Sequence, residues 1–338
     1  MATILSSLFA GPDLRAQDEL RPALIDDEIQ GAIDRGLSYL VRAQNRDGSW
    51  RYAGGHGSYP IAMTALAGMA LLGNGSTPTR GRYQREVQRA KDFLLRSVDE
   101  EGLISTPTEE RRSMYGHGFA TMFLAQVYGM EEDPVERERI RLTLEGAVEL
   151  IDRAQSAEGG WLYRPDSVGD EGSVTITQVQ ALRACRDAGI TVPRQVIDDA
   201  LAYIEKSANP DGGIRYSYGS PGAGRPAITA AAVCVFYNSG VYENDLAERA
   251  YEFATSRVGK FVVRGDHPFY THLYLSQAHY QRGPEDFDPY YQSTSEALLR
   301  LQASDGSWSD PGGGETYGTA VALTILQLPL ARVPIYQR

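Results

Sequence analysis

The sequence predicts an all-α protein built as an α6/α6 toroid, in which six helical hairpins place one ring of helices inside another. Two observations predict this fold class. A helix, a turn that contains glycine, a polar loop and a second helix recur six times at intervals of roughly 47 to 57 residues. The first helix of each unit carries charge on one side, whereas the second is apolar or small nearly all round and is therefore expected in the inner ring.

The first unit contains the clearest copy of the repeated pattern, in residues 35–50. Its apolar positions have helical spacing, and Gly48 follows them because glycine adopts the left-handed conformation that ends a helix without a Cβ penalty. The amide of Gln44 is expected to bond carbonyl groups at the helix end, and the indole of Trp50 is expected to cover the next unit. Residues 59–72 then supply the apolar second helix.

The remaining five units repeat this order less perfectly, and the fifth has a degenerate turn at Gly259. Because each unit buries its apolar face only against its neighbours, six units predict twelve helices in a single domain, residues 26–338. In the second, fourth and fifth units the first and second helices are represented by residues 90–95 and 114–124, 201–204 and 227–233, and 251–254 and 269–275. In the third and sixth units the turn is the clearest feature: Gln155, Gly159 and Trp161 precede the second helix at 175–182, and Gln302 and Trp308 precede the second helix at 317–323.

Composition excludes several classes of protein. A net charge of −11 argues against a nucleic-acid surface, and no apolar run approaches the roughly 18 to 20 residues of a spanning helix, so we do not expect an integral membrane protein. Cys185 and Cys234 both lie in apolar helical stretches and match no metal or disulfide spacing, so they are expected in the core, with a reactive thiol as the minor alternative. No metal and no cofactor is predicted.

The N-terminal residues 1–25 leave two interpretations open. The apolar segment 4–10 precedes a tolerable cleavage site at 14–17, which is consistent with a shortened secretory signal and an exported or periplasmic protein. The segment is short and lacks a basic region, which is equally consistent with a flexible tail on a cytoplasmic protein.

The spacing of residues 35–50, Arg-Gly-x-x-Tyr-Leu-x-x-x-Gln-x-x-x-Gly-x-Trp, resembles the QW motif of squalene and oxidosqualene cyclases. Residues 155–161 and 302–308 repeat its core, and residues 305–308 followed by 317–319 resemble the last repeat of those cyclases. The resemblance covers residues 30–330. It implies the six-hairpin toroid shared by terpene cyclases, protein prenyltransferase β-subunits and complement thioester domains.

In that superfamily the ligand pocket lies in the centre of the toroid, at the end where the inner helices begin. The resemblance therefore implies a binding site made by the first residues of the second helix of each unit. The residues expected there are Tyr59, Met63, Tyr115, His117, Thr177, Gln178, Thr229, Tyr270, His272, Tyr317 and Thr319.

The acid of a class II cyclase is missing, because the sequence contains no Asp-x-Asp-Asp motif. Residues 315–320 have the flanking pattern of that motif, but Tyr317 stands where the acid belongs, and a phenol with a pKa near 10 is a poor donor to an alkene. Asp286 and Asp288 are the nearest alternative acids. They are expected before an outer helix, in a loop or helix-start role.

Zinc prenyltransferase chemistry is also incomplete. Residues 269–274 resemble the stretch that carries the zinc-binding histidine of those enzymes, but His272 is shifted by one residue. The Asp-x-Cys pair is absent, since Cys234 lies too far along its helix, and one histidine is not a zinc site. The Cys-Gly-Glu-Gln of thioester proteins is absent as well.

Two further sets of residues are candidates for binding. His117 and His272 occupy the same place in units two and five, so they would either face one another across the cavity or satisfy hydrogen bonds with tyrosines and loop backbone. Loop arginines and the glycine-rich pieces 54–57 and 312–314 would hold an anion, although acidic residues share these loops. The loop arginines are Arg51, Arg111, Arg112, Arg164, Arg215, Arg225 and Arg264, and the loop acids are Glu109, Glu110, Asp166, Asp170, Glu171, Asp266 and Asp310.

Three functions stay open from the sequence. The first is a divergent repeat protein that binds a small apolar or isoprenoid-like ligand, or a peptide, in the central cavity without standard cyclase or zinc prenyltransferase chemistry. The second is an isoprenoid-processing enzyme whose candidate catalytic residues are His117, His272, Tyr317 and Glu315. The third is a polysaccharide lyase or hydrolase on an α/α toroid, for which no paired inner carboxylates are evident.

Overall fold

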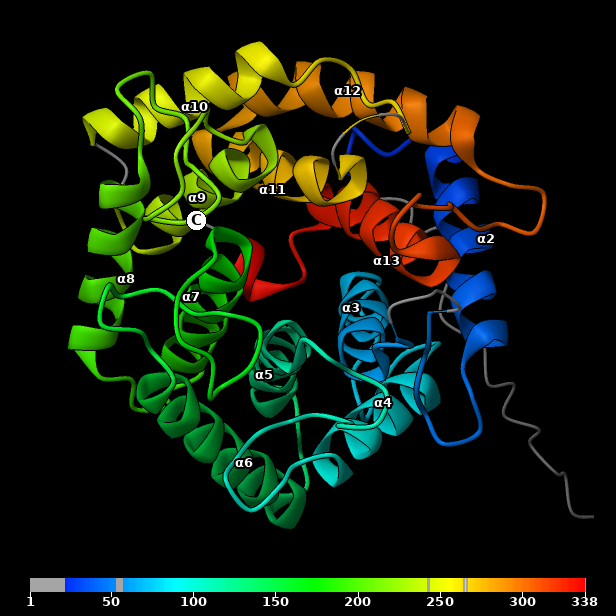
Figure 1. Ribbon diagram of the computed structural model, residues 1–338. Coiled ribbons are helices and arrows are strands. Elements are labelled where there is room, and N and C mark those ends of the chain that lie inside the picture. Colours follow the sequence, from blue (N-terminus) through cyan, green and yellow to red (C-terminus); the bar gives the residue numbers. More distant parts are fainter. Residues whose placement is uncertain (1–21, 53–56, 242–243, 264, 266, 338) are drawn as a thin grey trace, which may run out of the picture.

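The computed structural model describes residues 22–52, 57–241, 244–263, 265 and 267–337. Within these ranges the chain forms twelve α-helices and two short 3₁₀-helices and no named β-strand, which confirms the predicted all-α class (Figure 1). The predicted signal remnant or tail lies almost wholly outside the described residues and stays a prediction. Gly54, Gly55 and His56 of the glycine-rich piece, together with Arg264 and Asp266, also lie outside the described residues.

Inner and outer helices alternate along the chain, as the repeats predict. Each inner helix packs against the next, and the last packs against the first, which closes the ring seen end-on in Figure 1. The inner helices are α3 (Pro60–Gly73), α5 (Ser113–Tyr128), α7 (Gly172–Asp187), α9 (Pro226–Asn238), α11 (Pro268–Arg282) and α13 (Gly314–Gln327). The outer helices are α2 (Asp27–Ala43), α4 (Gln84–Arg96), α6 (Pro134–Arg153), α8 (Arg194–Ser207), α10 (Asp245–Arg257) and α12 (Pro284–Leu301).

Side-chain size explains how the inner helices fit so closely. All residues of α3 are buried, whereas α4 buries only one face. Glycines allow the inner helices to approach each other, because a Cβ on Gly116 would touch Ile61 of α3 and one on Gly118 would collide with Thr177 of α7. The apolar second helices are therefore inner helices for a steric reason as well as a hydrophobic one.

The turns of the repeat connect neighbouring outer helices. The Gln44 amide donates to the Gly48 carbonyl and to the Glu86 carbonyl of α4, both at 3.0 Å. The Trp50 indole donates to the Leu40 carbonyl at 2.8 Å. Both side chains make structural contacts, but with other partners than expected: the glutamine reaches the turn and the next outer helix, and the hydrogen bond of the indole stays within its own unit. The same geometry recurs at the third and sixth units, where Gln302 donates to the Ala32 carbonyl of α2 and so joins the last unit to the first.

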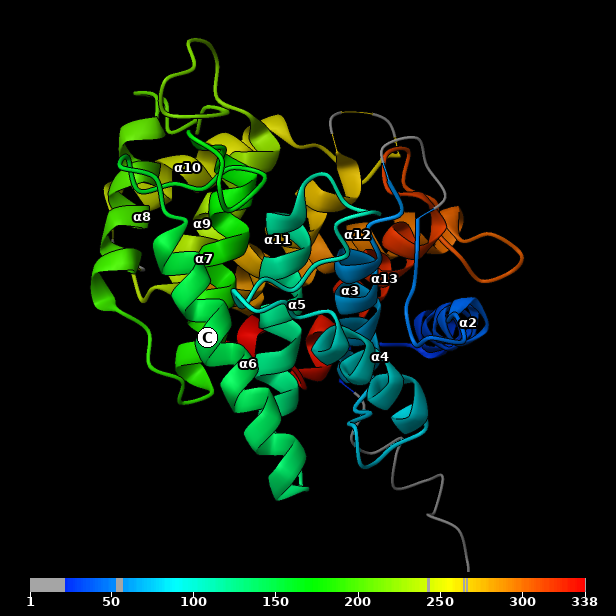
Figure 2. The same cartoon turned by 60° about the horizontal axis from the view of Figure 1, so that its bottom comes forward.

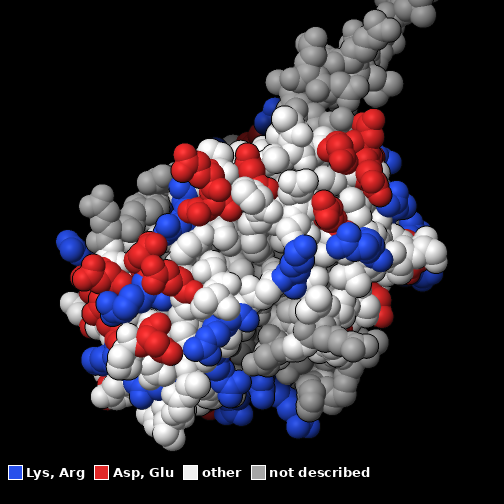
Figure 3. All heavy atoms as spheres, turned by 90° about the horizontal axis from the view of Figure 1, so that it is seen from above, with Lys and Arg blue, Asp and Glu red and all other residues white. Residues whose placement is uncertain are grey.

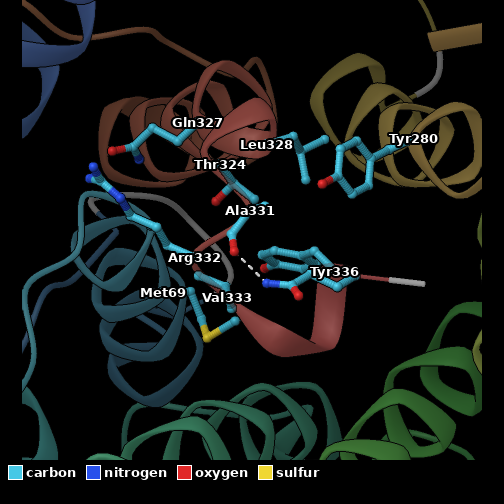
Figure 4. A pocket seen from close by; sticks show the side chains of 11 residues that line it. Met69, Tyr280, Thr324, Gln327, Leu328, Ala331, Arg332, Val333 and Tyr336 are labelled. Atoms are coloured by element: carbon cyan, nitrogen blue, oxygen red, sulfur yellow. Dashed lines mark hydrogen bonds between the residues drawn. The ribbon is translucent and has the colours of Figure 1, made fainter. Parts of the chain in front are cut away.

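One end of the toroid is closed by the C-terminal segment. After α13, η1 (Leu328–Leu330) and η2 (Pro334–Tyr336) cross the end where the inner helices finish (Figure 1). Ile335 is fully buried, and its amide donates to the Gln126 side chain of α5 at 3.3 Å. The cavity left beside this segment has a volume of about 10 Å³, which holds a single water molecule (Figure 4).

The opposite end of the toroid carries the loops that lead into the inner helices. Loops that precede inner helices, such as those before α9 and α13, project to the same side of the molecule (Figure 2). Deeper inside, the Gln180 amide of α7 donates to the Gln277 side chain of α11 at 3.3 Å, so polar side chains meet across the toroid beyond the middle of the inner helices. Among the helices described, none has the length and apolar character needed to cross a membrane.

Candidate functional site

Tyrosines from three inner helices meet at the open end, which we call the mouth. Tyr115 of α5, Tyr270 of α11 and Tyr317 of α13 are each half-buried near the start of their helix. Burial raises the pKa of all three phenols well above the usual value. After burial, the groups that raise the pKa of Tyr270 are Tyr274, Tyr115, Glu171 and Tyr317, so side chains of α5, α7, α11 and α13 lie near one phenol.

The Tyr270 hydroxyl and the neighbouring Tyr274 hydroxyl are both buried, and neither has a partner within normal hydrogen-bond distance among the described residues. Each phenol is the other's nearby polar group, since Tyr270 contributes to the pKa of Tyr274. The Tyr270 ring lies 4.7 Å from the ring of Tyr274, centroid to centroid, on the same helix. A buried hydroxyl without a partner is costly, so a ligand oxygen at this position would be favourable.

Glu171 orients the neighbouring phenol. It is the N-cap of α7 and only 2% exposed, and its carboxylate accepts hydrogen bonds from the amide of Val174 at 2.9 Å and from the hydroxyl of Ser173 at 2.7 Å. The Tyr115 hydroxyl also donates to Glu171, at 3.1 Å. Sequence reasoning counted Glu171 only as a loop acid. The signal that could have identified it is its place directly before an inner helix, where a carboxylate caps the first turn.

The rim beside Tyr115 continues as a row of aromatic rings covered by arginines. Tyr163 lies 6.1 Å from Tyr115, centroid to centroid, and its hydroxyl is hydrogen-bonded to that of Tyr216. The guanidinium of Arg112 lies 4.2 Å above the Tyr163 ring, and that of Arg225 lies 5.1 Å from the Tyr216 ring. Arg112 and Arg225 are therefore at the mouth, where they stack on tyrosines.

Arg51, predicted as a ligand-binding residue, is already occupied. Its guanidinium pairs with Glu109 at 2.9 Å and with Asp47 at 3.0 Å. These acids come from the same loops that the sequence weighed against anion binding, and here they cancel the charge of the arginine. Tyr59 is half-buried beside this group, in left-handed backbone conformation directly before α3.

His117 and His272 do not face the cavity, which corrects their placement among the predicted site residues. His117 is fully buried, and its Nδ1 accepts from the Ile104 amide in the turn of the second unit at 3.1 Å. The Nδ1 of His272 is hydrogen-bonded to the Tyr290 hydroxyl of outer helix α12 at 2.7 Å. The alternative, that each satisfies a tyrosine or loop backbone, is what the structure shows. Burial lowers the pKa of both imidazoles to about 4, and His279 adds to the effect at His272.

A shared position in the repeat explains His117. The residue after the glycine turn donates its amide to an acceptor on the following inner helix, and in four other units that acceptor is threonine. Thr229 and Thr319 were predicted to bind ligand but serve as these buried acceptors, which is a second correction. The four bonds run from Trp50 to Thr64, Trp161 to Thr175, Ile214 to Thr229 and Trp308 to Thr319, at 2.9 to 3.0 Å.

Thr177, Gln178 and Met63 also lie between helices rather than open to the mouth. The Thr177 hydroxyl donates to the Ser173 carbonyl of its own helix at 2.8 Å, and the Gln178 amide donates to the Met114 carbonyl of α5 at 2.9 Å. All three predicted residues are buried. The Gln178 bond holds α7 against α5.

The remaining acids fall into two kinds. Glu315 is exposed, and Ser309 donates to it at 3.2 Å. Asp286 and Asp288 lie inside the first turns of α12 rather than before it, and Asp286 pairs with Arg282 at 2.6 Å. None of these three is at the tyrosine cluster.

Glu110 stands out among the described loop acids by the raised pKa of its carboxyl. It is 6% exposed, and its Oε1 accepts from the Ile61 amide at the start of α3 at 2.9 Å. Its Oε2 has no hydrogen-bond partner among the described residues. Burial raises the pKa of this carboxyl to about 7, so it holds a proton near neutral pH. The raised pKa could not be predicted from the local sequence, because the partner amide lies at the start of α3.

The described residues contain no group of three histidine, cysteine or acidic side chains that would hold a metal ion. Cys185 and Cys234 are fully buried, as expected of core residues, and burial raises the pKa of the Cys185 thiol to about 12. The Cys234 thiol donates to the Tyr274 carbonyl at 2.9 Å.

A closed double ring of helices with a tyrosine-lined mouth is the architecture of a terpene cyclase-like toroid. No family model matches the chain. It is 27% identical over 191 residues to drimenyl diphosphate synthase of Streptomyces showdoensis, and 27% identical over 187 residues to that of Streptantibioticus cattleyicolor. The matches cover 56% and 55% of this chain but only 33% and 32% of those proteins, so the chain corresponds to about a third of their length.

Solved structures show the same fold. The type II terpene cyclase MstE from Scytonema aligns with a TM-score of 0.62 at 16% identity, over 92% of this chain and all of that one. An α-1,6-mannanase of Salegentibacter aligns with a TM-score of 0.68 at 10% identity, over 90% of this chain and all of that one. The chain is therefore similar in sequence to part of two drimenyl diphosphate synthases and shares the toroid fold of a terpene cyclase and of a mannanase.

Proposed function

We propose that the protein binds an isoprenoid-like ligand, an apolar chain with an oxygen-bearing head group, at the mouth, and that it lacks the usual acid catalysis of terpene cyclases. The observation that carries the proposal is the convergence of Tyr115, Tyr270 and Tyr317 around a hydroxyl without a partner in the described chain. Aromatic faces pack well against alkene chains, and the unpaired hydroxyl would gain a hydrogen bond to a ligand oxygen.

The depth of the site limits how the ligand binds. The C-terminal segment closes the far end, and the bond between Gln180 and Gln277 crosses the interior above it. A ligand therefore enters and leaves through the mouth alone. Arg112, stacked on Tyr163 at the rim, is placed to attract an anionic head group.

The residues at the mouth are poorly suited to the acid catalysis of standard terpene cyclases. Tyr317 replaces the expected acid, and burial makes its phenol an even weaker acid, since the pKa is well above the usual value. His117 and His272 are turned toward the outer layer. The relatives support a terpenoid ligand, because two curated ones are named drimenyl diphosphate synthases and MstE has been solved with geranylgeranyl dihydroxybenzoate as substrate.

The test is a binding titration with isoprenoid alcohols and diphosphates of increasing chain length, followed by native mass spectrometry and product analysis. We expect saturable binding with unchanged ligand recovered. The variant Tyr270→Phe should weaken binding by about tenfold, the value of one buried hydrogen bond, whereas Tyr218→Phe, at an exposed phenol, should not. Failure of every ligand to bind would refute the proposal.

An isoprenoid-processing enzyme is the second candidate, and Glu110 is the observation that favours it. A carboxyl with a pKa of about 7 and one unpartnered oxygen can donate a proton near neutral pH. A cyclised or isomerised product in the same assay, lost in Glu110→Gln, would establish this activity in place of simple binding.

A polysaccharide hydrolase gains no support from the acids at the mouth. Asp170 and Glu171 are adjacent, but Asp170 accepts from the Tyr218 amide at 3.1 Å while Glu171 is directed to Tyr115. Each carboxylate is thus already engaged by a different partner, so this pair does not support the two free carboxyl groups that glycoside hydrolysis requires.

A further inference from the structure

The turn of the fifth unit is not docked like the others. In five units the turn glycine has a left-handed φ and lies against the backbone of the next outer helix, as Gly48 does against Arg89 of α4 and Gly306 against Arg35 of α2. In the fifth unit the corresponding residue is Gly259, and nothing lies within 4 Å of the position of a Cβ there. This turn therefore stands away from α12.

The space that results is a cavity of about 200 Å³ between the end of α10, inner helix α11 and outer helix α12. It lies outside the inner ring, so it is separate from the mouth. An apolar cavity of about 150 Å³ accommodates benzene, so this one has room for a molecule of a single ring. The outer face over α10 and α12 carries interspersed acids and bases rather than a patch of one charge, which suits a small ligand better than a macromolecule (Figure 3).

One wall of the cavity is rigid and aromatic. The Tyr290 ring stacks on His279 with centroids 4.2 Å apart and planes at 21°. The Tyr290 hydroxyl is fixed by His272 at 2.7 Å, and His279 is fixed by the Tyr251 hydroxyl at 2.8 Å. Val258 and Leu275 complete the apolar lining, and a planar ring would pack between these surfaces.

The polar lining includes hydroxyls, which can donate or accept hydrogen bonds, and one lysine. Ser293 and Thr294 of α12 contribute hydroxyls, and Lys260 contributes an ammonium group that makes no ion pair within the described chain. No carboxylate is among the described residues that line the cavity. A lining of this kind matches an anionic ligand with several acceptor oxygens.

We propose that this cavity binds a small aromatic carboxylate, with its ring against Tyr290 and its carboxylate at Lys260 and the α12 hydroxyls. The site is independent of the function proposed for the mouth. Benzoate is the probe, measured by calorimetry and by ligand-observed NMR on the full chain, with benzamide as the neutral analogue of the same shape.

We expect saturable benzoate binding at millimolar concentration or below and much weaker benzamide binding. Lys260→Gln should weaken benzoate binding by about tenfold, because it removes one charge-assisted hydrogen bond, while Lys206→Gln, at a lysine on α8, should leave it unchanged. Ser293→Phe should abolish binding by filling the cavity. Absence of saturable binding, equal binding of benzamide, or full binding by Lys260→Gln would each overturn the proposal. Lys260 is exposed, so Lys260→Gln is expected to fold and still tests the site if Ser293→Phe does not fold.

Discussion

Replacing Glu110 by glutamine should change the pH dependence of stability in a way that only a buried, protonated carboxyl explains. The folded protein raises the pKa of this group from 4.5 to about 7. A raised pKa means that the folded state is fully stable below about pH 4.5 and loses stability as the pH rises through 7. At 1.36 kcal/mol for each pKa unit, ionising Glu110 costs about 3 kcal/mol at pH values well above 7.

Glutamine resembles the protonated carboxyl and keeps an acceptor for the Ile61 amide. We therefore expect Glu110→Gln to match the wild type at about pH 5 and to be more stable by about 3 kcal/mol at about pH 8.5, measured by urea unfolding at both pH values. Glu109→Gln is the matched control. Its pKa is lowered, chiefly by the Arg51 hydrogen bond, so it should lose a similar small amount of stability at both pH values. An equal effect of Glu110→Gln at both pH values would refute the reasoning.

Two further predictions concern stability. Burial lowers the pKa of His117, His272 and His279 to about 4, so the unfolded state binds more protons than the folded state below about pH 6.5. The free energy of unfolding should therefore fall by up to about 3 kcal/mol for each histidine between about pH 6.5 and 4. Urea unfolding across that pH range measures this fall. Gly48→Ala should lower the free energy of unfolding by about 2 to 4 kcal/mol, because it adds a collision with an α4 carbonyl to the strain of the left-handed backbone. Gly189→Ala, at a similar φ with nothing within 4 Å, should lower it by only about 1 to 2 kcal/mol. Thermal unfolding compares the two variants, and equal losses would contradict the role of the collision.

The fold was predictable because its determinants are local and repeated. Gln44, Gly48 and Trp50 lie within seven residues of one another, and each contact they make is copied by another unit. Helix order and the inner and outer rings then follow from the apolar pattern alone. The course of the C-terminal segment could not be predicted from the repeats, because Ile335 is hydrogen-bonded to Gln126, which is more than half of the sequence away.

The site was less predictable because position in the repeat does not show which way a side chain points. His117 and Tyr115 are two residues apart on one helix, and successive positions differ by about 100°, so one meets the outer layer while the other lies at the mouth. The histidines were predicted as site residues because imidazoles can act as acids, bases or ligands. The turn, however, requires only a hydrogen-bond acceptor, and an imidazole nitrogen supplies one as well as a threonine hydroxyl does. Glu110 was missed because its environment is made by α3, which a pattern within α5 cannot reveal.

Ring closure and the proposed ligand binding depend on different residues, and this separation can be tested at Tyr270. The turns that join neighbouring outer helices use glutamine, glycine and tryptophan, none of which lies at the mouth. The Tyr270 hydroxyl contributes no hydrogen bond to the described chain, so Tyr270→Phe removes a desolvation cost without breaking a contact. Thermal unfolding should therefore show unchanged or slightly higher stability, by up to about 1 kcal/mol, in the same variant that weakens isoprenoid binding. A clear loss of stability would mean that the hydroxyl serves the fold, and the mouth would then lose the group on which the proposed ligand site depends.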